Sequence, residues 1–228
     1  MTPAIRKRLV QIGALVLFQA VLLFLSAGRL SWGAGWAYVL LYIAFIAMNG
    51  VILFPCQESR EMIEERSQIK AGSKGWDKII GVIMTLFAPA ILVVAGLDER
   101  LGWSSELALW ARIVAGAVLV LSYGLFGWAM ASNRFFSSVV RIQKDRGHTV
   151  QSGGPYAHVR HPAYASQLIS CLAIPLMLGS VWAYLPVALF IITLIVRTAL
   201  EDRTLQNELE GYKEYAGRVQ NRLIPGVR

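Results

Sequence analysis

Long apolar runs without a single charged residue constrain this sequence more than any other feature. Four runs of about 19–20 residues are each long enough to cross a hydrocarbon core of roughly 30 Å as an α-helix. They occupy residues 9–27, 36–54, 79–97 and 113–132. Two shorter runs, 163–179 and 181–196, meet at Gly179 and Ser180 and predict a helical hairpin. The sequence therefore predicts an all-α, polytopic membrane bundle of about six spans, as a single domain over residues 1–228.

The basic residues predict the orientation of these spans. The chain is 56% hydrophobic and 16% charged, and its formal net charge is +8. With the N-terminus inside, 19 of the 22 Lys and Arg fall in the cytoplasmic segments 1–8, 55–78, 133–162 and 197–228. This asymmetry is typical of the positive-inside rule, and it explains the net charge without a nucleic-acid partner. We expect a multi-pass protein of the inner (cytoplasmic) membrane with both termini in the cytoplasm.

The polar residues divide the chain into two regions. Residues 1–132 hold the first four spans, with an amphipathic segment on the cytoplasmic surface over 57–78. Residues 133–228 form a C-terminal region whose polar stretches lie before the fifth span and after the sixth. Because both stretches face the same compartment, we expect them to meet and form a cytoplasm-facing pocket.

The stretch "GGPYAHVRHPAYAS" interrupts the apolar pattern at residues 153–166. Gly153 and Gly154 favour a turn that lets the backbone approach a neighbour closely. Pro162 suits the first turn of a helix, whose free N–H groups, together with Arg160 and His161, suit an anionic group. A basic loop with a turn and no ligand is the alternative interpretation.

Three histidines in this region do not predict a metal site. His148, His158 and His161 are not on a helix that would bring them onto one face, and no cysteine or acidic cluster accompanies them. We therefore expect no metal.

A second polar stretch begins where the sixth span ends. Arg197 and Glu201 are four residues apart, so they lie on one helical face near the membrane interface. They form either a weak surface pair or part of a functional site. Further on, Tyr212 and Tyr215 are typical of interfacial anchors.

These motifs together resemble a known enzyme family. The sequence "GHTVQSGGPYAHVRHPAYAS", followed by "RTALED", "YKEY" and "RLIP", is similar to the isoprenylcysteine carboxyl methyltransferase family of the membrane phospholipid methyltransferases. The resemblance extends over residues 141–225. The chain departs from the family at Ser166, where the family usually has glycine, and in its short acidic pair, Glu201 and Asp202.

The resemblance implies S-adenosyl-L-methionine as the methyl donor and assigns residues to it. It implies catalytic roles for Arg197, Glu201 and His161, with Glu201 at the amino end of the cofactor and Arg197 facing the methyl acceptor. The implied cofactor-binding residues are Gln143, His148, Thr149, Val150, Gln151, Tyr156, His161, Pro162, Ala163, Tyr164 and Glu201.

The chemistry of the acceptor is less constrained by the residues. A carboxylate or thiolate is already nucleophilic and needs only a cation such as Arg197 to place it, whereas an amine also needs a base. This favours a carboxylate or thiolate on a lipid-like or isoprenoid molecule that enters from the bilayer. Three alternatives stay open: a phospholipid N-methyltransferase acting on ethanolamine headgroups, an NADPH-dependent membrane reductase, and a non-enzymatic transporter.

Overall fold

The computed structural model describes residues 3–53 and 72–226. Within these residues the chain is helical and contains no strand. Five helices are long and apolar enough to cross a membrane. They are α1 (Pro3–Ala27), α2 (Gly33–Leu53), α4 (Gly75–Leu101), α5 (Leu109–Ala131) and α7 (Tyr184–Glu208). The predicted class, a polytopic helical membrane bundle, is confirmed.

Shorter elements complete the described chain. Helix α6 (Pro162–Leu178) is apolar but has 17 residues, and α8 (Tyr212–Arg218) has seven. Two 3₁₀ turns, η1 (Lys144–Arg146) and η2 (Gly154–Ala157), lie in the connection between α5 and α6. The prediction of about six spans thus corresponds to five long helices and the shorter α6.

The last long helix extends beyond the apolar run that predicted it. The run ends at residue 196, whereas α7 continues for about three more turns to Glu208. Charged residues do not end a helix once it leaves the apolar region, because Arg, Glu, Leu and Gln are good helix formers. Arg197 and Glu201 therefore stand on a rigid helix. Most of the surface segment predicted over 57–78 lies outside the described residues, but 75–78 form the first turn of α4.

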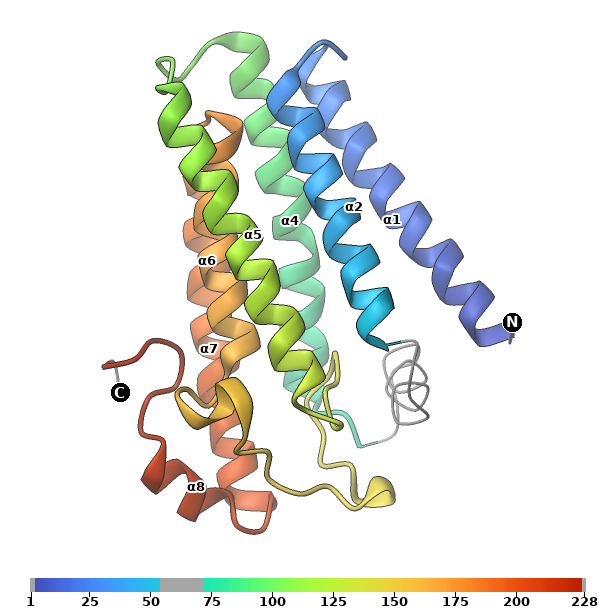
Figure 1. Ribbon diagram of the computed structural model, residues 1–228, viewed down its shortest axis with the longest axis vertical. Coiled ribbons are helices and arrows are strands. Elements are labelled where there is room, and N and C mark those ends of the chain that lie inside the picture. The colour runs from blue at the N-terminus through green and yellow to red at the C-terminus, as the bar shows by residue number, and fades with distance from the viewer. Residues whose placement is uncertain (1–2, 54–71, 227–228) are drawn as a thin grey trace.

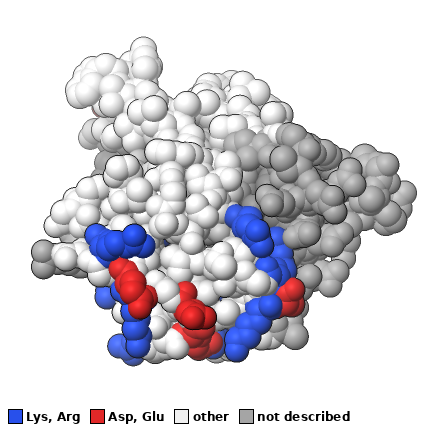
Figure 2. Space-filling model, turned by 60° about the horizontal axis from the view of Figure 1, so that its bottom comes forward, with Lys and Arg blue, Asp and Glu red and all other residues white. Residues whose placement is uncertain are grey.

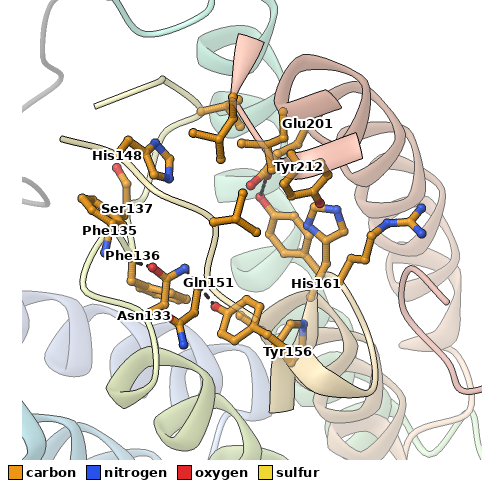
Figure 3. Close-up of a pocket in the computed structure, with 18 of the residues that line it drawn as sticks. Asn133, Phe135, Phe136, Ser137, His148, Gln151, Tyr156, His161, Glu201 and Tyr212 are labelled. Carbon is orange, nitrogen blue, oxygen red and sulfur yellow. Dashed lines mark hydrogen bonds between the residues drawn. The ribbon is translucent and has the colours of Figure 1, made fainter. Parts of the chain in front are cut away.

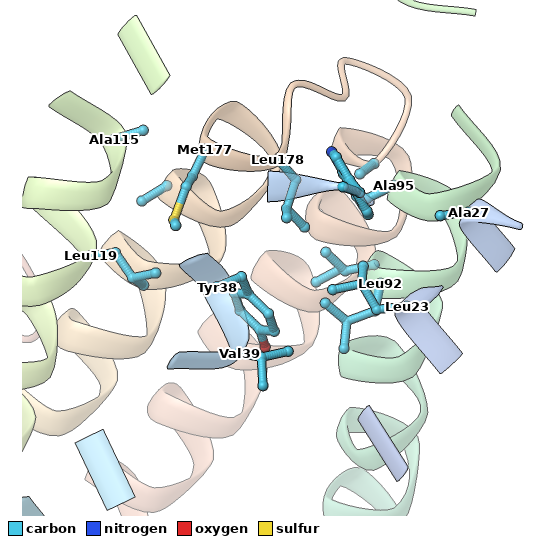
Figure 4. Close-up of a cluster of buried hydrophobic side chains, with 14 of the residues drawn as sticks. Leu23, Ala27, Tyr38, Val39, Leu92, Ala95, Ala115, Leu119, Met177 and Leu178 are labelled. Carbon is cyan, nitrogen blue, oxygen red and sulfur yellow. The ribbon is translucent and has the colours of Figure 1, made fainter. Parts of the chain in front are cut away.

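The helices pack around an apolar core near one end of the bundle. α5 packs mainly against α6, and α1 packs mainly against α4 (Figure 1). Figure 4 shows Tyr38 of α2 between Leu23 and Leu92 on one side and Leu119 on the other. Many other large apolar side chains face outward, and Leu121 is 73% exposed. An apolar outer surface suits a bundle surrounded by lipid.

One glycine lets α1 and α4 approach closely. A Cβ atom on Gly96 would lie 2.0 Å from Oγ of Ser26 and 2.7 Å from the carbonyl oxygen of Leu23. Small residues at helix crossings are typical of packing inside membranes, where close backbone approach stabilises the pair.

The two ends of the bundle differ in how much chain they carry. At one end the helices are joined by short connections, such as residues 28–32 and 179–183. At the other end lie the long α5–α6 connection, the last turns of α7, α8 and the C-terminal tail (Figure 1). We call this second end the site end. Figure 2, turned toward it, shows charged side chains gathered in one part of the view.

A second apolar cluster attaches this extra chain to the bundle. It joins α5 and α6 to η2, the end of α7 and α8 through Ala129, Tyr156, Ala163, Leu209, Tyr212 and Tyr215. Tyr212 and Tyr215 are 5% and 1% exposed. The prediction that these two tyrosines are interfacial anchors is therefore wrong, because they are core residues of the site end.

Candidate functional site

A cavity of about 260 Å³ lies at the site end of the bundle. Its walls come from the α5–α6 connection, the first turns of α6, the last turns of α7, and α8. All the positions that the family resemblance assigned line this one cavity: Gln143, His148, Thr149, Val150, Gln151, Tyr156, His161, Pro162, Ala163, Tyr164, Arg197 and Glu201. Figure 3 shows His148 and Phe135 on one side of it, with Tyr156, His161 and Glu201 on the other.

The turn before α6 is shaped by a close contact with α5. Gly154 has a φ of +59°, and a Cβ atom there would lie 2.5 Å from Oγ of Ser132. Glycine is therefore required at this position both by the backbone conformation and by the space. The turn brings Tyr156 into the wall of the cavity, where its hydroxyl accepts a hydrogen bond from the amide of Asn133 at 3.2 Å.

The start of α6 is held by the C-terminal tail. His161 is the N-cap and Pro162 is the first helical residue, as predicted from the sequence. The backbone N–H groups of Arg160 and His161 donate to the carbonyl oxygens of Asn221 and Arg222, both at 2.9 Å. These two N–H groups are thus used by the protein itself and do not face a ligand.

The guanidinium of Arg160 is also committed to the protein, contrary to the prediction that it binds an anionic ligand group. It forms a bidentate pair with Asp202 at 2.8 and 2.9 Å and donates to the carbonyl oxygens of Val219 and Gln220. Asp202 is 0% exposed and also lies 3.3 Å from Nε2 of His161. A buried carboxylate needs such partners, because the loss of its hydration is costly.

Glu201, the neighbour of Asp202, faces the cavity and accepts one hydrogen bond from the residues that the structure describes. The hydroxyl of Tyr164 donates to its Oε2 at 2.5 Å. The Tyr164 ring stacks on His161 with centroids 5.7 Å apart and planes 14° apart. Tyr164 therefore fixes two predicted site residues at once, which limits its own freedom to stack on a ligand.

Arg197 does not pair with Glu201, although the two are one helical turn apart. Its Nε donates to Oδ1 of Asp77 on α4 at 2.8 Å, and its Nη2 donates to the carbonyl oxygen of Ser138 at 2.9 Å. The guanidinium carbon lies 5.5 Å from the centroid of the Tyr164 ring. Sequence reasoning missed Asp77. The available signal was an acidic residue just before an apolar run, at the end of the predicted surface segment.

The loop from Gln143 to His148 is held by its own side chains. The Gln143 amide donates to the carbonyl oxygen of Phe135 at 2.6 Å and accepts from Arg146 at 2.6 Å. The amide that was predicted to contact the cofactor is therefore engaged at both ends and shapes the loop. Burial, followed by the positive charges of Arg141 and Arg146, lowers the pKa of His148 to about 4, so its imidazole is neutral at pH 7.

A second cavity of about 450 Å³ adjoins the first between α4 and α7. Gly81, Met84 and Thr85 of α4 and Phe190 of α7 form its walls. The two cavities share the side chains of Ser138, Val139, Gln167 and Arg197. Arg197 thus stands at their junction.

In the part of the chain that the structure describes, no group of three or more His, Cys, Asp or Glu residues could hold a metal ion. The donors that line the cavity are carboxylate, imidazole, hydroxyl and amide groups. Such a set suits an organic ligand with several polar groups.

The fold and the cavity together define an integral membrane protein, a helical bundle with a ligand cavity at one end. The sequence model of the isoprenylcysteine carboxyl methyltransferase (ICMT) family matches residues 114–207, from α5 to the last turn of α7. This match agrees with the family that the motifs indicated, and it covers less than half of the chain. No curated protein matches the chain. The match to this family supports the assignment of the protein as a membrane methyltransferase.

Proposed function

We propose that this protein transfers a methyl group from S-adenosyl-L-methionine to a carboxylate or thiolate on a lipid-like or isoprenoid acceptor. The observation that carries the proposal is the meeting of two cavities at Arg197. One cavity contains Glu201 and His161, and the other lies between two membrane-spanning helices.

The groups that line the first cavity fit the chemistry of the cofactor. Glu201 offers a carboxylate to the ammonium of its methionine part. The first-turn N–H groups of Ala163 and Tyr164 have no acceptor within α6, so they suit the carboxylate of the cofactor in place of Arg160. Aromatic side chains, among them Phe135 and Tyr156, line the cavity and suit an adenine ring.

S-adenosyl-L-methionine, when bound, supplies a methyl group on a sulfonium, which is already activated for transfer. The protein then contributes position and the exclusion of water. Tyr164 holds the Glu201 carboxylate in one orientation through their hydrogen bond. Arg197, at the junction of the cavities, faces the side from which an acceptor would come and can place an anionic group.

The partners of the possible bases favour an acceptor that needs no deprotonation. Glu201 accepts a hydrogen bond from Tyr164, and Nε2 of His161 faces Asp202. Glu201 is also assigned to the ammonium of the cofactor, so neither group is left to deprotonate an acceptor that Arg197 would place. A carboxylate or thiolate avoids the need for one, whereas an ethanolamine headgroup does not.

The cavity between α4 and α7 would hold the apolar part of the acceptor. A Cβ atom on its wall residue Gly81 would have no neighbouring atom within 4 Å, so the side chain of Gly81→Leu can begin there and would narrow the cavity. Gly124 of α5 is equally free of neighbours and lies outside both cavities, which makes Gly124→Leu a matched control.

The test is methyl transfer from labelled S-adenosyl-L-methionine by the reconstituted protein. The acceptors are a farnesylated cysteine, a long-chain thiol and phosphatidylethanolamine. We expect transfer to one of the first two, with a KM for the acceptor raised on the order of tenfold in Gly81→Leu and unchanged in Gly124→Leu. Transfer to phosphatidylethanolamine alone would replace the proposal with N-methylation, and no transfer to any of the three would contradict it.

The proposal includes the orientation predicted from the basic residues, with the site end in the cytoplasm. Lys213 of α8 and Ser105 of the α4–α5 connection are exposed residues at opposite ends of the bundle. A membrane-impermeant thiol reagent added to intact cells should label Ser105→Cys and not Lys213→Cys. The reverse pattern would overturn the orientation.

A further inference from the structure

Asp77 lies outside the segment matched by the family model and does not line the cavity assigned to the cofactor. We infer that Asp77 is a positioning residue that holds Arg197 away from Glu201 and so keeps the Glu201 carboxylate available to the cofactor. The inference rests on the proposed function, because it assigns Glu201 to the cofactor.

The contacts of Asp77 fix it firmly. Its side chain is 0% exposed, its Oδ1 accepts from Nε of Arg197 at 2.8 Å, and its Oδ2 accepts from the backbone N–H of Val140 at 2.7 Å. It also stands in the first turn of α4, where the helix dipole favours a negative charge. Both carboxylate oxygens are thus engaged, and the orientation of the group is set by two separate elements.

Arg197 has two carboxylates within reach of its helix position. Glu201 is four residues further along α7, a spacing at which opposite charges pair on a helix surface. In the structure the guanidinium turns instead to Asp77, which is 120 residues away in sequence, and to the carbonyl oxygen of Ser138. The presence of Asp77 therefore determines which of the two carboxylates pairs with Arg197.

The consequence is a separation of charges inside the site. With Arg197 on Asp77, the Glu201 carboxylate is not paired with Arg197 and accepts only the hydroxyl of Tyr164 among the described residues. If Asp77 were neutral, Arg197 would be a buried cation without a carboxylate partner. Its side chain is only 11% exposed, so pairing with Glu201 would be strongly favoured. That pair would compete with the ammonium of the cofactor for the same oxygens.

A purely structural role for Asp77 makes a different prediction. Asp77 also ties α4 to α7, and its loss could loosen the site in general. A second bridge joins the same two regions, because Nζ of Lys74, the residue before α4, donates to both carboxylate oxygens of Glu208 at 2.6 and 2.8 Å. Glu208 does not line either cavity at Arg197, so Glu208→Gln is a matched control for the loss of a tie between α4 and α7.

The test is the affinity for S-adenosylhomocysteine, measured by calorimetry on the full chain in one detergent. This ligand keeps the ammonium and needs no acceptor and no turnover. We expect Asp77→Ala to weaken its binding on the order of tenfold and Glu208→Gln to leave the affinity unchanged. In an Arg197→Gln background, the further change Asp77→Ala should have no effect, because the cation that would occupy Glu201 is absent.

Other outcomes overturn the inference. Wild-type affinity in Asp77→Ala, or an equal loss in the Arg197→Gln background, would show that Asp77 does not act through Arg197. Should Asp77→Ala fail to fold, Asp77→Asn keeps an acceptor for the Val140 N–H and removes the charge, and it must show the same dependence on Arg197. Failure of the wild-type protein to bind S-adenosylhomocysteine would instead contradict the proposed function itself.

Discussion

Two consecutive carboxylates on α7, Glu201 and Asp202, belong to two regions with different tasks. Asp202 is 0% exposed. Its partners come from the connection just before α6, from α7, from α8 and from the C-terminal tail. They are Arg160, His161, Gln206, Tyr212 and Arg222. Glu201 faces the cavity and, within the part of the chain that the structure describes, accepts one hydrogen bond, from Tyr164. Both oxygens of the Asp202 carboxylate thus have several partners, whereas the Glu201 carboxylate, one residue away, has one hydrogen-bond donor among the described residues.

The number of donors around each carboxylate separates a structural role from a ligand-binding role in this site. A buried carboxylate with a full set of donors has no capacity left for a ligand, and its energetic role is to hold its donors together. A carboxylate beside a cavity with one neutral donor keeps that capacity. We call the region around Asp202 the latch, meaning Asp202, Arg160 and the tail residues 219–222, because it fastens the tail to the start of α6.

The largest loss of stability is expected when Asp202, the centre of the latch, is replaced. Asp202→Ala would leave the buried guanidinium of Arg160 without its carboxylate, at a cost to the free energy of unfolding of about 3–5 kcal/mol. Denaturation in detergent measures this change. Glu201→Gln is the matched control on the next residue and should cost about 1 kcal/mol or less, because only one hydrogen bond changes. An equal loss of stability in both variants would remove the distinction between the two carboxylates.

A smaller loss of stability is expected from a change in α8 where it contacts the wall of the cavity. The buried hydroxyl of Tyr215 donates to the backbone carbonyl oxygen of Tyr156 at 2.7 Å. Tyr215→Phe keeps the ring and removes this bond, so we expect a loss of about 1–2 kcal/mol in the free energy of unfolding. Because the Tyr156 wall belongs to the cavity, cofactor affinity should also fall slightly. Unchanged denaturation curves would show that α8 does not stabilise this wall.

The effect that is smallest at neutral pH is a dependence of stability on pH, which comes from His148 at the cavity. The pKa of His148 is lowered to about 4 in the folded protein, mainly by burial, against 6.5 for an ordinary histidine. Protonation therefore favours the unfolded chain, and stability from this group is lost as the pH falls from 6.5 toward 4. Well above pH 6.5 the imidazole is neutral in both states and contributes no pH dependence.

His148→Gln tests this prediction because it removes the titrating group and keeps a polar side chain. Thermal unfolding midpoints measured from about pH 7.5 down to about pH 4.5 should fall more steeply for the wild-type protein than for the variant. Parallel midpoints across this range would contradict the lowered pKa.

Much of the fold could be predicted from the sequence, because its main signal is local. The absence of charge over a membrane-sized run is visible in one stretch, and α5 (Leu109–Ala131) closely follows the predicted run 113–132. The end of α7 was not predicted, because the prediction relied on the absence of charge. Charge marks the edge of the apolar region, whereas helix propensity continues to Glu208.

The site was predictable where its residues are contiguous and unpredictable where pairs form at a distance. The motif from His148 to Tyr164 could be located because its turn and its helix start are local. Two pairs form between distant residues: Asp77 and Arg197 are 120 residues apart, and Arg160 and Asp202 are 42 residues apart. No spacing in the sequence predicts either pair. The sequence therefore suggested that Arg160 binds a ligand, whereas its guanidinium is engaged in the latch. It also gave no indication that Arg197 pairs with Asp77.

In the proposed function, Glu201 holds the cofactor while Arg197 serves the acceptor. The most direct test measures S-adenosyl-L-methionine affinity and methyl transfer for Glu201→Gln and Arg197→Ala in the same detergent. We predict that Glu201→Gln weakens cofactor binding on the order of tenfold or more, because a charged hydrogen bond is lost. Arg197→Ala should bind the cofactor nearly as the wild-type protein does and lose turnover, because the acceptor is no longer aligned. Wild-type turnover in Arg197→Ala, or wild-type cofactor affinity in Glu201→Gln, would contradict the account.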